Sequence, residues 1–130
     1  MPDTLTVHPL APAAGEEPAL YVCVWDHVAR YVTWLDAANG RGPYETAVRV
    51  MKIAEEAGEA AAAYIGTTGA NPCKGVTATP DDLAGELCDV VLAALIALAT
   101  ITGGTPHAES RLARHVAARA IRLRALRAAA

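Results

Sequence analysis

Apolar residues recur at spacings of three and four along most of the chain, and this spacing is typical of amphipathic helices. In residues 19–38 such a stripe is formed by Tyr21, Trp25, Val28, Val32 and Leu35. Residues 43–65 begin at a proline, which suits a first helical turn, and carry a stripe of Ala47, Met51, Ala54, Gly58, Ala61 and Ile65. The small residues on the second stripe predict that another helix approaches closely. Close packing is also a reason for Gly58, which is costly inside a helix.

A third helix is predicted to begin at Thr79-Pro80-Asp81-Asp82 and to run to about Ile101. Threonine is a good N-cap, proline suits the first turn, and the acids favour the positive end of the helix dipole. Residues 90–101 are apolar on every side up to Thr100, a pattern typical of a buried helix. We therefore expect burial around Asp89 and a core position for Cys88.

A fourth helix, residues 106–127, has a stripe of Leu112, Val116 and Leu123, and no convincing strand pattern appears. The sequence thus predicts an all-α fold, a four-helix bundle with short links. Residues 1–18 contain four prolines and no periodicity, so we expect a flexible N-terminal tail before a single domain of residues 19–130.

Composition agrees with packed helices, since 53% of the residues are hydrophobic and phenylalanine is absent. The three cysteines show no CxxC spacing, which argues against a disulfide framework or a zinc site and for a reducing compartment. No secretory signal is evident, and the 12 residues of the 90–101 run are fewer than the roughly 20 that span a bilayer. We expect a cytoplasmic protein with no membrane partner.

Charge is distributed unevenly around the net value of -3. The last 20 residues hold six arginines and no acid. Such a basic segment can contact nucleic acid or a membrane, but more often its arginines pair with acidic helices of the same fold or of a dimer mate. We favour the second interpretation and do not expect nucleic acid as a partner.

Five acids form two groups, Glu55, Glu56 and Glu59 within KIAEEAGEAAAA, and Glu86 and Asp89 three residues apart. A solvated helix face is the ordinary interpretation of the first group. The second group enters the apolar segment, where an unpaired carboxylate costs several kcal/mol. Protonation, arginines from another helix or a divalent cation would relieve that cost. If the second and third helices pack side by side, the two groups converge into an oxygen-only ligand set that suits Mg²⁺ or Mn²⁺.

The sequences EEAGE at 55–59 and ELCD at 86–89, separated by 26 residues, resemble the EExxE…ExxD signature of MazG-like, all-α nucleoside triphosphate pyrophosphohydrolases. The resemblance covers residues 20–120. It implies a helical dimer or dimer of dimers that needs Mg²⁺. It also implies hydrolysis of a (d)NTP or noncanonical nucleotide to the monophosphate and pyrophosphate.

By motif position, the resemblance implies that the metal ligands are Glu56, Glu59, Glu86 and Asp89. It also implies that Glu55 orients or deprotonates the attacking water. The chain departs from many relatives at Ile96, near where they carry an asparagine or another polar residue. Because of that departure, the resemblance does not define which residues contact the substrate.

Further candidates for substrate contact are Lys52, Lys74, Trp34 and Arg41. Each has a simpler interpretation: Lys52 pairs with Glu56, the loop residues Lys74 and Arg41 are solvated, and Trp34 belongs to the core. Two other functions compete with the enzyme. In the first alternative, the chain is a catalytically weak or inactive relative that acts as a nucleotide-binding or regulatory protein. In the second, it is a helical interaction module whose acidic face binds the basic end of another chain.

Overall fold

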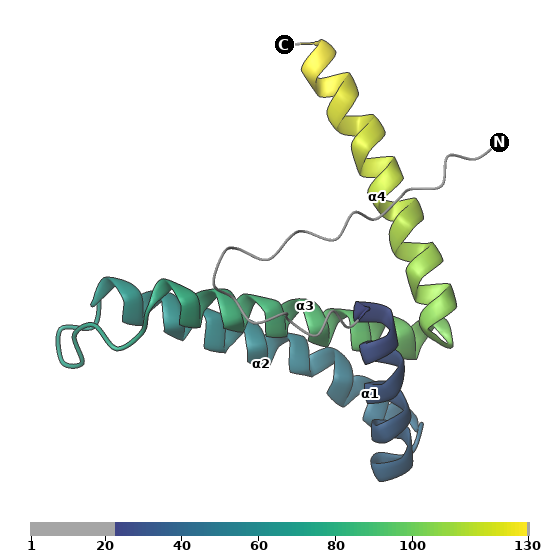
Figure 1. Ribbon diagram of the computed structural model, residues 1–130, viewed down its shortest axis with the longest axis horizontal. Helices are drawn as coiled ribbons and strands as arrows, with labels where there is room; N and C mark the ends of the chain where they lie inside the picture. The colour runs from purple at the N-terminus through teal and green to yellow at the C-terminus, as the bar shows by residue number, and fades with distance from the viewer. Residues whose placement is uncertain (1–22, 130) are drawn as a thin grey trace, which may run out of the picture.

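The computed structural model describes residues 23–129, and within this range it contains four α-helices and no strand. The helices are α1 (Val24–Asn39), α2 (Pro43–Thr68), α3 (Pro80–Thr102) and α4 (Thr105–Ala128), as Figure 1 shows. The predicted all-α class and the number of helices are therefore confirmed. The predicted tail and Tyr21 lie outside the described residues.

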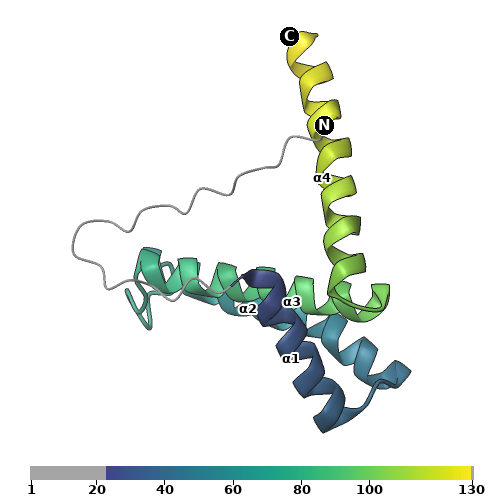
Figure 2. The same cartoon turned by 45° about the vertical axis from the view of Figure 1, so that its right-hand side comes forward.

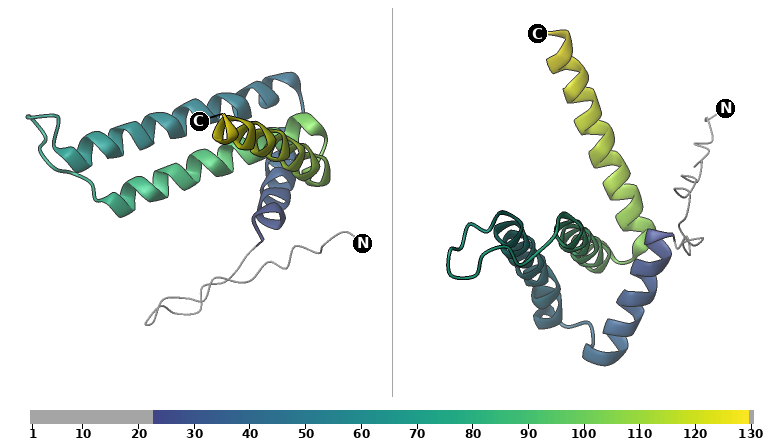
Figure 3. Two further views of the ribbon diagram at one scale, coloured as in Figure 1. Left: turned by 90° about the horizontal axis from the view of Figure 1, so that it is seen from above. Right: turned by 60° about the vertical axis from the view of Figure 1, so that its left-hand side comes forward.

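The helices α2 and α3 form an antiparallel pair that lies side by side along most of its length (Figures 1 and 3). The end of α2 and the segment before α3 approach closely at Gly66, where an added Cβ would lie 2.7 Å from Thr77 Oγ1. The start of α3 matches the prediction. Thr79 Oγ1 accepts a hydrogen bond from the Asp82 backbone N–H (3.1 Å), and Asp82 Oδ2 accepts one from the Thr79 N–H (2.7 Å). This capping box fixes the direction of α3.

A small core lies where α1, the end of α3 and the first turn of α4 meet. Val28, Ala99 and Ala108 are almost fully buried there, and half-buried apolar side chains pack around them. Beyond its first turns α4 projects away from the other helices (Figures 1 and 2). Its predicted stripe is accordingly covered only at Leu112, while Val116 and Leu123 are each 57% exposed. For most of α4 the predicted core stripe is wrong.

The predicted core stripe of α2 is also wrong, because all six of its residues are exposed in the single chain. Met51 is 67% exposed, and no atom lies within 4 Å of a Cβ built on Gly58. The buried face instead carries Glu45, Arg49, Glu56, Ala60 and Gly66. Residues two apart differ by about 200° around a helix, so Ala47 and Arg49 lie on nearly opposite faces. The pattern misled because charged residues on the buried face are paired with one another.

The helix α3 is less covered than its composition predicts. Cys88 and Asp89 are both exposed, which corrects the expected core cysteine and buried carboxylate. Of the large apolar residues before Ala93, Leu87 is 52% exposed and Val91 is 55% exposed. With 23 residues and a mean hydropathy of 2.0 over its most apolar window, α3 is long and apolar enough to cross a membrane. Core helices of soluble proteins also meet this criterion of length and composition, so it is weak evidence by itself.

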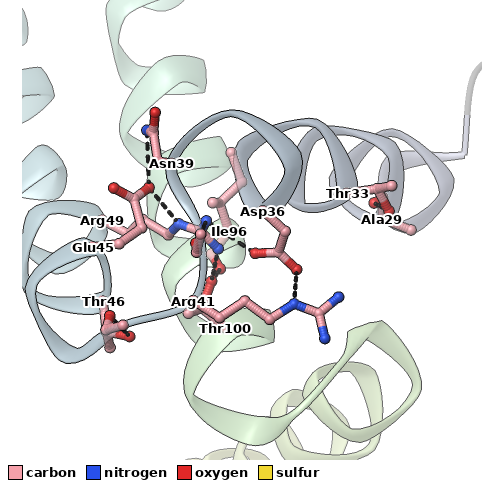
Figure 4. A network of polar contacts seen from close by, with 12 residues as sticks. Ala29, Thr33, Asp36, Asn39, Arg41, Glu45, Thr46, Arg49, Ile96 and Thr100 are labelled. Carbon is pink, nitrogen blue, oxygen red and sulfur yellow. Dashed lines mark hydrogen bonds and ion pairs between the residues drawn. The ribbon is translucent and has the colours of Figure 1, made fainter.

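A buried arginine joins three of the helices. The side chain of Arg49 is only 4% exposed. Its Nε donates to Glu45 Oε1 (2.9 Å), its Nη2 lies 3.0 Å from Asp36 Oδ1, and its Nη1 donates to Thr100 Oγ1 (3.1 Å). Its Nη2 also donates to the Gly40 carbonyl at 3.4 Å. Figure 4 shows this guanidinium between the end of α1, the first turns of α2 and the end of α3.

The charges of this network stabilise one another. The hydrogen bond from Arg49 lowers the pKa of Glu45 below its ordinary value, with a smaller contribution from the Asn39 amide. Burial disfavours the charge on Arg49, but its bonds to Glu45 and Asp36 outweigh burial and raise its pKa. Glu45 therefore stabilises the fold above its unfolded-state pKa, and this contribution is lost as pH falls through its lowered folded-state pKa.

Replacing Arg49 by methionine should lower the free energy of unfolding by about 3 kcal/mol, because Glu45 would then be buried without a counter-ion and Asp36 would keep only its pair with the exposed Arg41. Urea denaturation followed by circular dichroism measures this change. Arg41→Met is the matched control, because Arg41 pairs with the same Asp36 (2.7 Å) while its side chain is 83% exposed. Exposed pairs contribute little, so equal stability of the two variants would contradict a central role for Arg49.

Candidate metal centre

The antiparallel packing of α2 and α3 brings the two acidic motifs together. Glu56 and Glu59 lie one turn apart on α2, and Glu86 and Asp89 lie one turn apart on α3. Each of Glu56, Glu86 and Asp89 places one carboxylate oxygen within 4.8 Å of those of the other two. The convergence that the sequence predicted for helices packed side by side is therefore present in the fold.

The predicted ligands differ in burial, and Glu59 is exposed although Glu56 on the same helix is buried. Glu56 is 9% exposed, Glu86 is half-buried and Asp89 is exposed. The neighbouring charge of Glu56 raises the pKa of Glu59 above its ordinary value of 4.5, and burial and the charge of Glu86 act in the same direction. Glu59 thus lies within the field of both motifs. The fourth predicted ligand is therefore electrostatically coupled to Glu56 and Glu86.

Lys52 provides the positive charge next to this cluster. Its Nζ lies 2.7 Å from Glu56 Oε1 and 3.1 Å from Glu55 Oε2, at spacings of four and three residues along α2. The hydrogen bonds to Glu56 and then to Glu55 raise the pKa of Lys52. The pairing that the sequence offered as the simple interpretation of Lys52 is present, and it involves a predicted metal ligand.

A cavity of about 240 Å³ adjoins the cluster. Glu56, Asp89 and Lys52 line one side of it, between α2 and α3. Its other walls come from all three of the packed helices and include His27, Tyr31, Leu35, Asn39, Glu45, Arg49, Leu92 and Ile96. The site therefore joins a carboxylate cluster to a pocket with aromatic, amide and apolar walls.

The remaining predicted residues lie elsewhere. Trp34 is 59% exposed and packs edge-on against Tyr31, with ring centroids 5.4 Å apart, so its expected core position is wrong. Arg41 pairs with Asp36 and lines a separate cavity of about 390 Å³, which none of the motif acids lines. Lys74 is exposed in the connection between α2 and α3, at the end of the pair far from α1 (Figure 1). Glu55 is linked to the cluster by its ion pair with Lys52, but its side chain is 59% exposed.

The structure adds residues that the sequence interpretation did not select. Tyr31, Asn39, Glu45 and Arg49 all line the pocket. A Glu–Arg pair four residues apart is usually a solvated surface pair, so its spacing alone carried no signal of burial. The one available signal was Thr100, the polar residue that interrupts the apolar run and accepts a hydrogen bond from Arg49.

Comparison with models of protein families, with curated proteins and with solved structures finds no match for this chain.

Removing the charge of Glu59 should stabilise the metal-free protein near neutral pH. Because the folded state raises the pKa of Glu59, its ionisation lowers stability as pH rises through the range just above 4.5. Glu59→Gln should therefore have a higher melting temperature than wild type at pH 7, measured in EDTA, and the difference should shrink as pH falls below 4.5. A variant that melts below wild type at pH 7 would contradict like-charge repulsion at the cluster.

Proposed function

We propose that this chain is a Mg²⁺-dependent nucleoside triphosphate pyrophosphohydrolase of the MazG-like type. It converts a (d)NTP or a noncanonical nucleotide to the monophosphate and pyrophosphate, and so cleans the nucleotide pool. The observation that carries the proposal is the meeting of Glu56, Glu86 and Asp89 across the α2–α3 pair, beside a pocket of about 240 Å³.

The donor set fits a small divalent cation. Glu56, Glu59, Glu86 and Asp89 offer only carboxylate oxygens, which are the donors that Mg²⁺ and Mn²⁺ prefer. The raised pKa of Glu59 records an excess of negative charge that such a cation would neutralise. When bound, Mg²⁺ supplies the positive charge that offsets a triphosphate and acidifies a coordinated water.

The chain's own residues would position the nucleotide. The pocket between α1, α2 and α3 is lined by the Tyr31 ring and the Asn39 amide, which suit the flat face and polar edge of a nucleobase. The Asn39 Nδ2 donates to Glu45 Oε1 at 3.3 Å, and Glu45 is fixed in turn by Arg49. This chain of bonds holds the amide at the pocket in one orientation.

The triphosphate would extend from this pocket toward the acids and Lys52. Glu55 is our candidate to orient or deprotonate the water that attacks the α-phosphorus, so that pyrophosphate leaves. The support for this role is the position of Glu55, which directly precedes Glu56 and pairs with the same Lys52. Most of the rate enhancement would come from positioning and from charge placed where the transition state needs it.

Asp89→Asn should lower kcat/KM for pyrophosphate release at least about 100-fold, as expected when one charged group of a phosphoryl-transfer site is lost. The assay is pyrophosphate release from a panel of canonical and modified dNTPs with Mg²⁺ or Mn²⁺. Asp81→Asn, which changes an exposed acid in the first turn of α3, is the control and should keep wild-type activity. Full activity of Asp89→Asn would show that the ligand assignment is wrong.

A homodimer, or a dimer of dimers, is part of the proposal. Among residues 23–129, only six apolar residues are buried in the single chain, while 17 large apolar side chains are exposed. Exposed residues on one face of α2, including Met51 and Ile65, and Leu87 and Val91 on α3 offer apolar area for a second copy. A second copy would give these helices the cover that one chain lacks.

Light scattering should therefore give at least twice the chain mass of 13.5 kDa. Met51→Glu should shift the protein toward the monomer, because it places a charge in the proposed interface. Val76→Glu is the control, since Val76 is 72% exposed in the loop outside the helices. A wild-type monomer, or equal masses for the two variants, would contradict this mode of association.

A further inference from the structure

Lys52 has a distinctive place in the charge distribution of the site. Its ammonium contacts Glu56, the most buried acid of the cluster, at 2.7 Å, and contacts the exposed Glu55 at 3.1 Å. In the part of the chain that the structure describes, no other Lys or Arg forms an ion pair with an acid of the two motifs. Lys52 is therefore the resident counter-ion of the cluster.

An ammonium and a divalent cation disfavour each other at one carboxylate, because like charges a few ångströms apart repel. Glu56 is held in place by its burial, whereas the Lys52 side chain is 46% exposed and can move into solvent. Glu55, with a side chain that is 59% exposed, gives the ammonium a second partner outside the cluster. Because Lys52 has both contacts, its ammonium can give up Glu56 to a divalent cation and remain paired with Glu55.

Lys52 also lines the cavity that adjoins the acids. An ammonium that leaves Glu56 without leaving Glu55 therefore stays close to this cavity. A triphosphate whose nucleoside occupies the cavity would pass this point, and Lys is an effective point-charge partner for phosphate oxygens.

We infer that Lys52 is an exchangeable counter-ion, which competes with the divalent cation for Glu56 and, once displaced, binds the phosphate chain of the substrate. The inference rests on the proposed metal-dependent function and adds a step to it. Lys52 satisfies Glu56 in the metal-free protein, Glu55 retains the displaced ammonium beside the cluster, and the incoming phosphates receive it. No covalent bond is made or broken in this exchange.

Calorimetric titration of Mn²⁺ into the nucleotide-free protein tests the competition. Lys52→Met should bind Mn²⁺ at least about threefold more tightly than wild type, because the competing charge is gone. At saturating Mn²⁺ the same variant should bind inorganic triphosphate at least about threefold more weakly. Lys52→Arg, which keeps the charge, should lie closer to wild type in both titrations, and Lys74→Met is the control for loss of one lysine outside the cluster.

The outcomes separate this inference from the function on which it rests. Unchanged or weaker Mn²⁺ binding by Lys52→Met, with binding by wild type intact, would overturn the competition alone. Unchanged triphosphate binding by Lys52→Met would overturn the transfer to phosphate. Absence of Mn²⁺ binding in wild type and in every variant, with normal helix content by circular dichroism, would overturn both the proposed function and this inference.

Discussion

The buried guanidinium of Arg49 is the interaction on which the arrangement of the site depends. Through Glu45, Asp36 and Thr100 it joins α1, α2 and α3 at one point. By drawing the face of α2 that carries Arg49 inward, it turns Glu56 toward α3 and leaves the small apolar stripe of α2 outside. The same contacts fix the pocket wall next to the acids. A single ion-pair network thus sets which side of α2 faces the neighbouring helices.

The acidic cluster works against the stability of the metal-free chain, and the rest of the fold tolerates it. Like charges raise the pKa of Glu59, and Lys52 offsets part of the repulsion at Glu56. Asp89 is exposed and Glu86 only half-buried, which reduces the cost further because water screens their charges. We propose that a divalent cation offsets the remaining charge, because among the described residues Lys52 is the one Lys or Arg that pairs with an acid of the two motifs.

Sequence patterns predicted the helices well, because caps, prolines and glycines act locally. The Thr79 capping box and the convergence of the two motifs were both predictable, the first from residue types and the second from a hairpin of adjacent helices. The buried face of α2 was not, because burial of Glu45 and Arg49 depends on partners in α1 and α3. Nor was the exposure of Asp89, since an apolar pattern predicts burial of a helix but does not show that the same chain covers it. The role of Asn39 in the pocket was not predictable either, because Asn39 lies on α1 and the acidic motifs lie on α2 and α3.

We propose that the carboxylates of α2 and α3 direct a divalent cation to the cleavage of a nucleotide between its α- and β-phosphates. Phosphorus NMR of a panel of dNTPs, incubated with the protein and Mg²⁺, is the sharpest test of this proposal because it identifies the bond that breaks. We expect resonances of a nucleoside monophosphate and pyrophosphate, which require Mg²⁺ or Mn²⁺ and disappear with EDTA. Release of orthophosphate and a diphosphate, or an unchanged spectrum for every nucleotide with either metal, would contradict it.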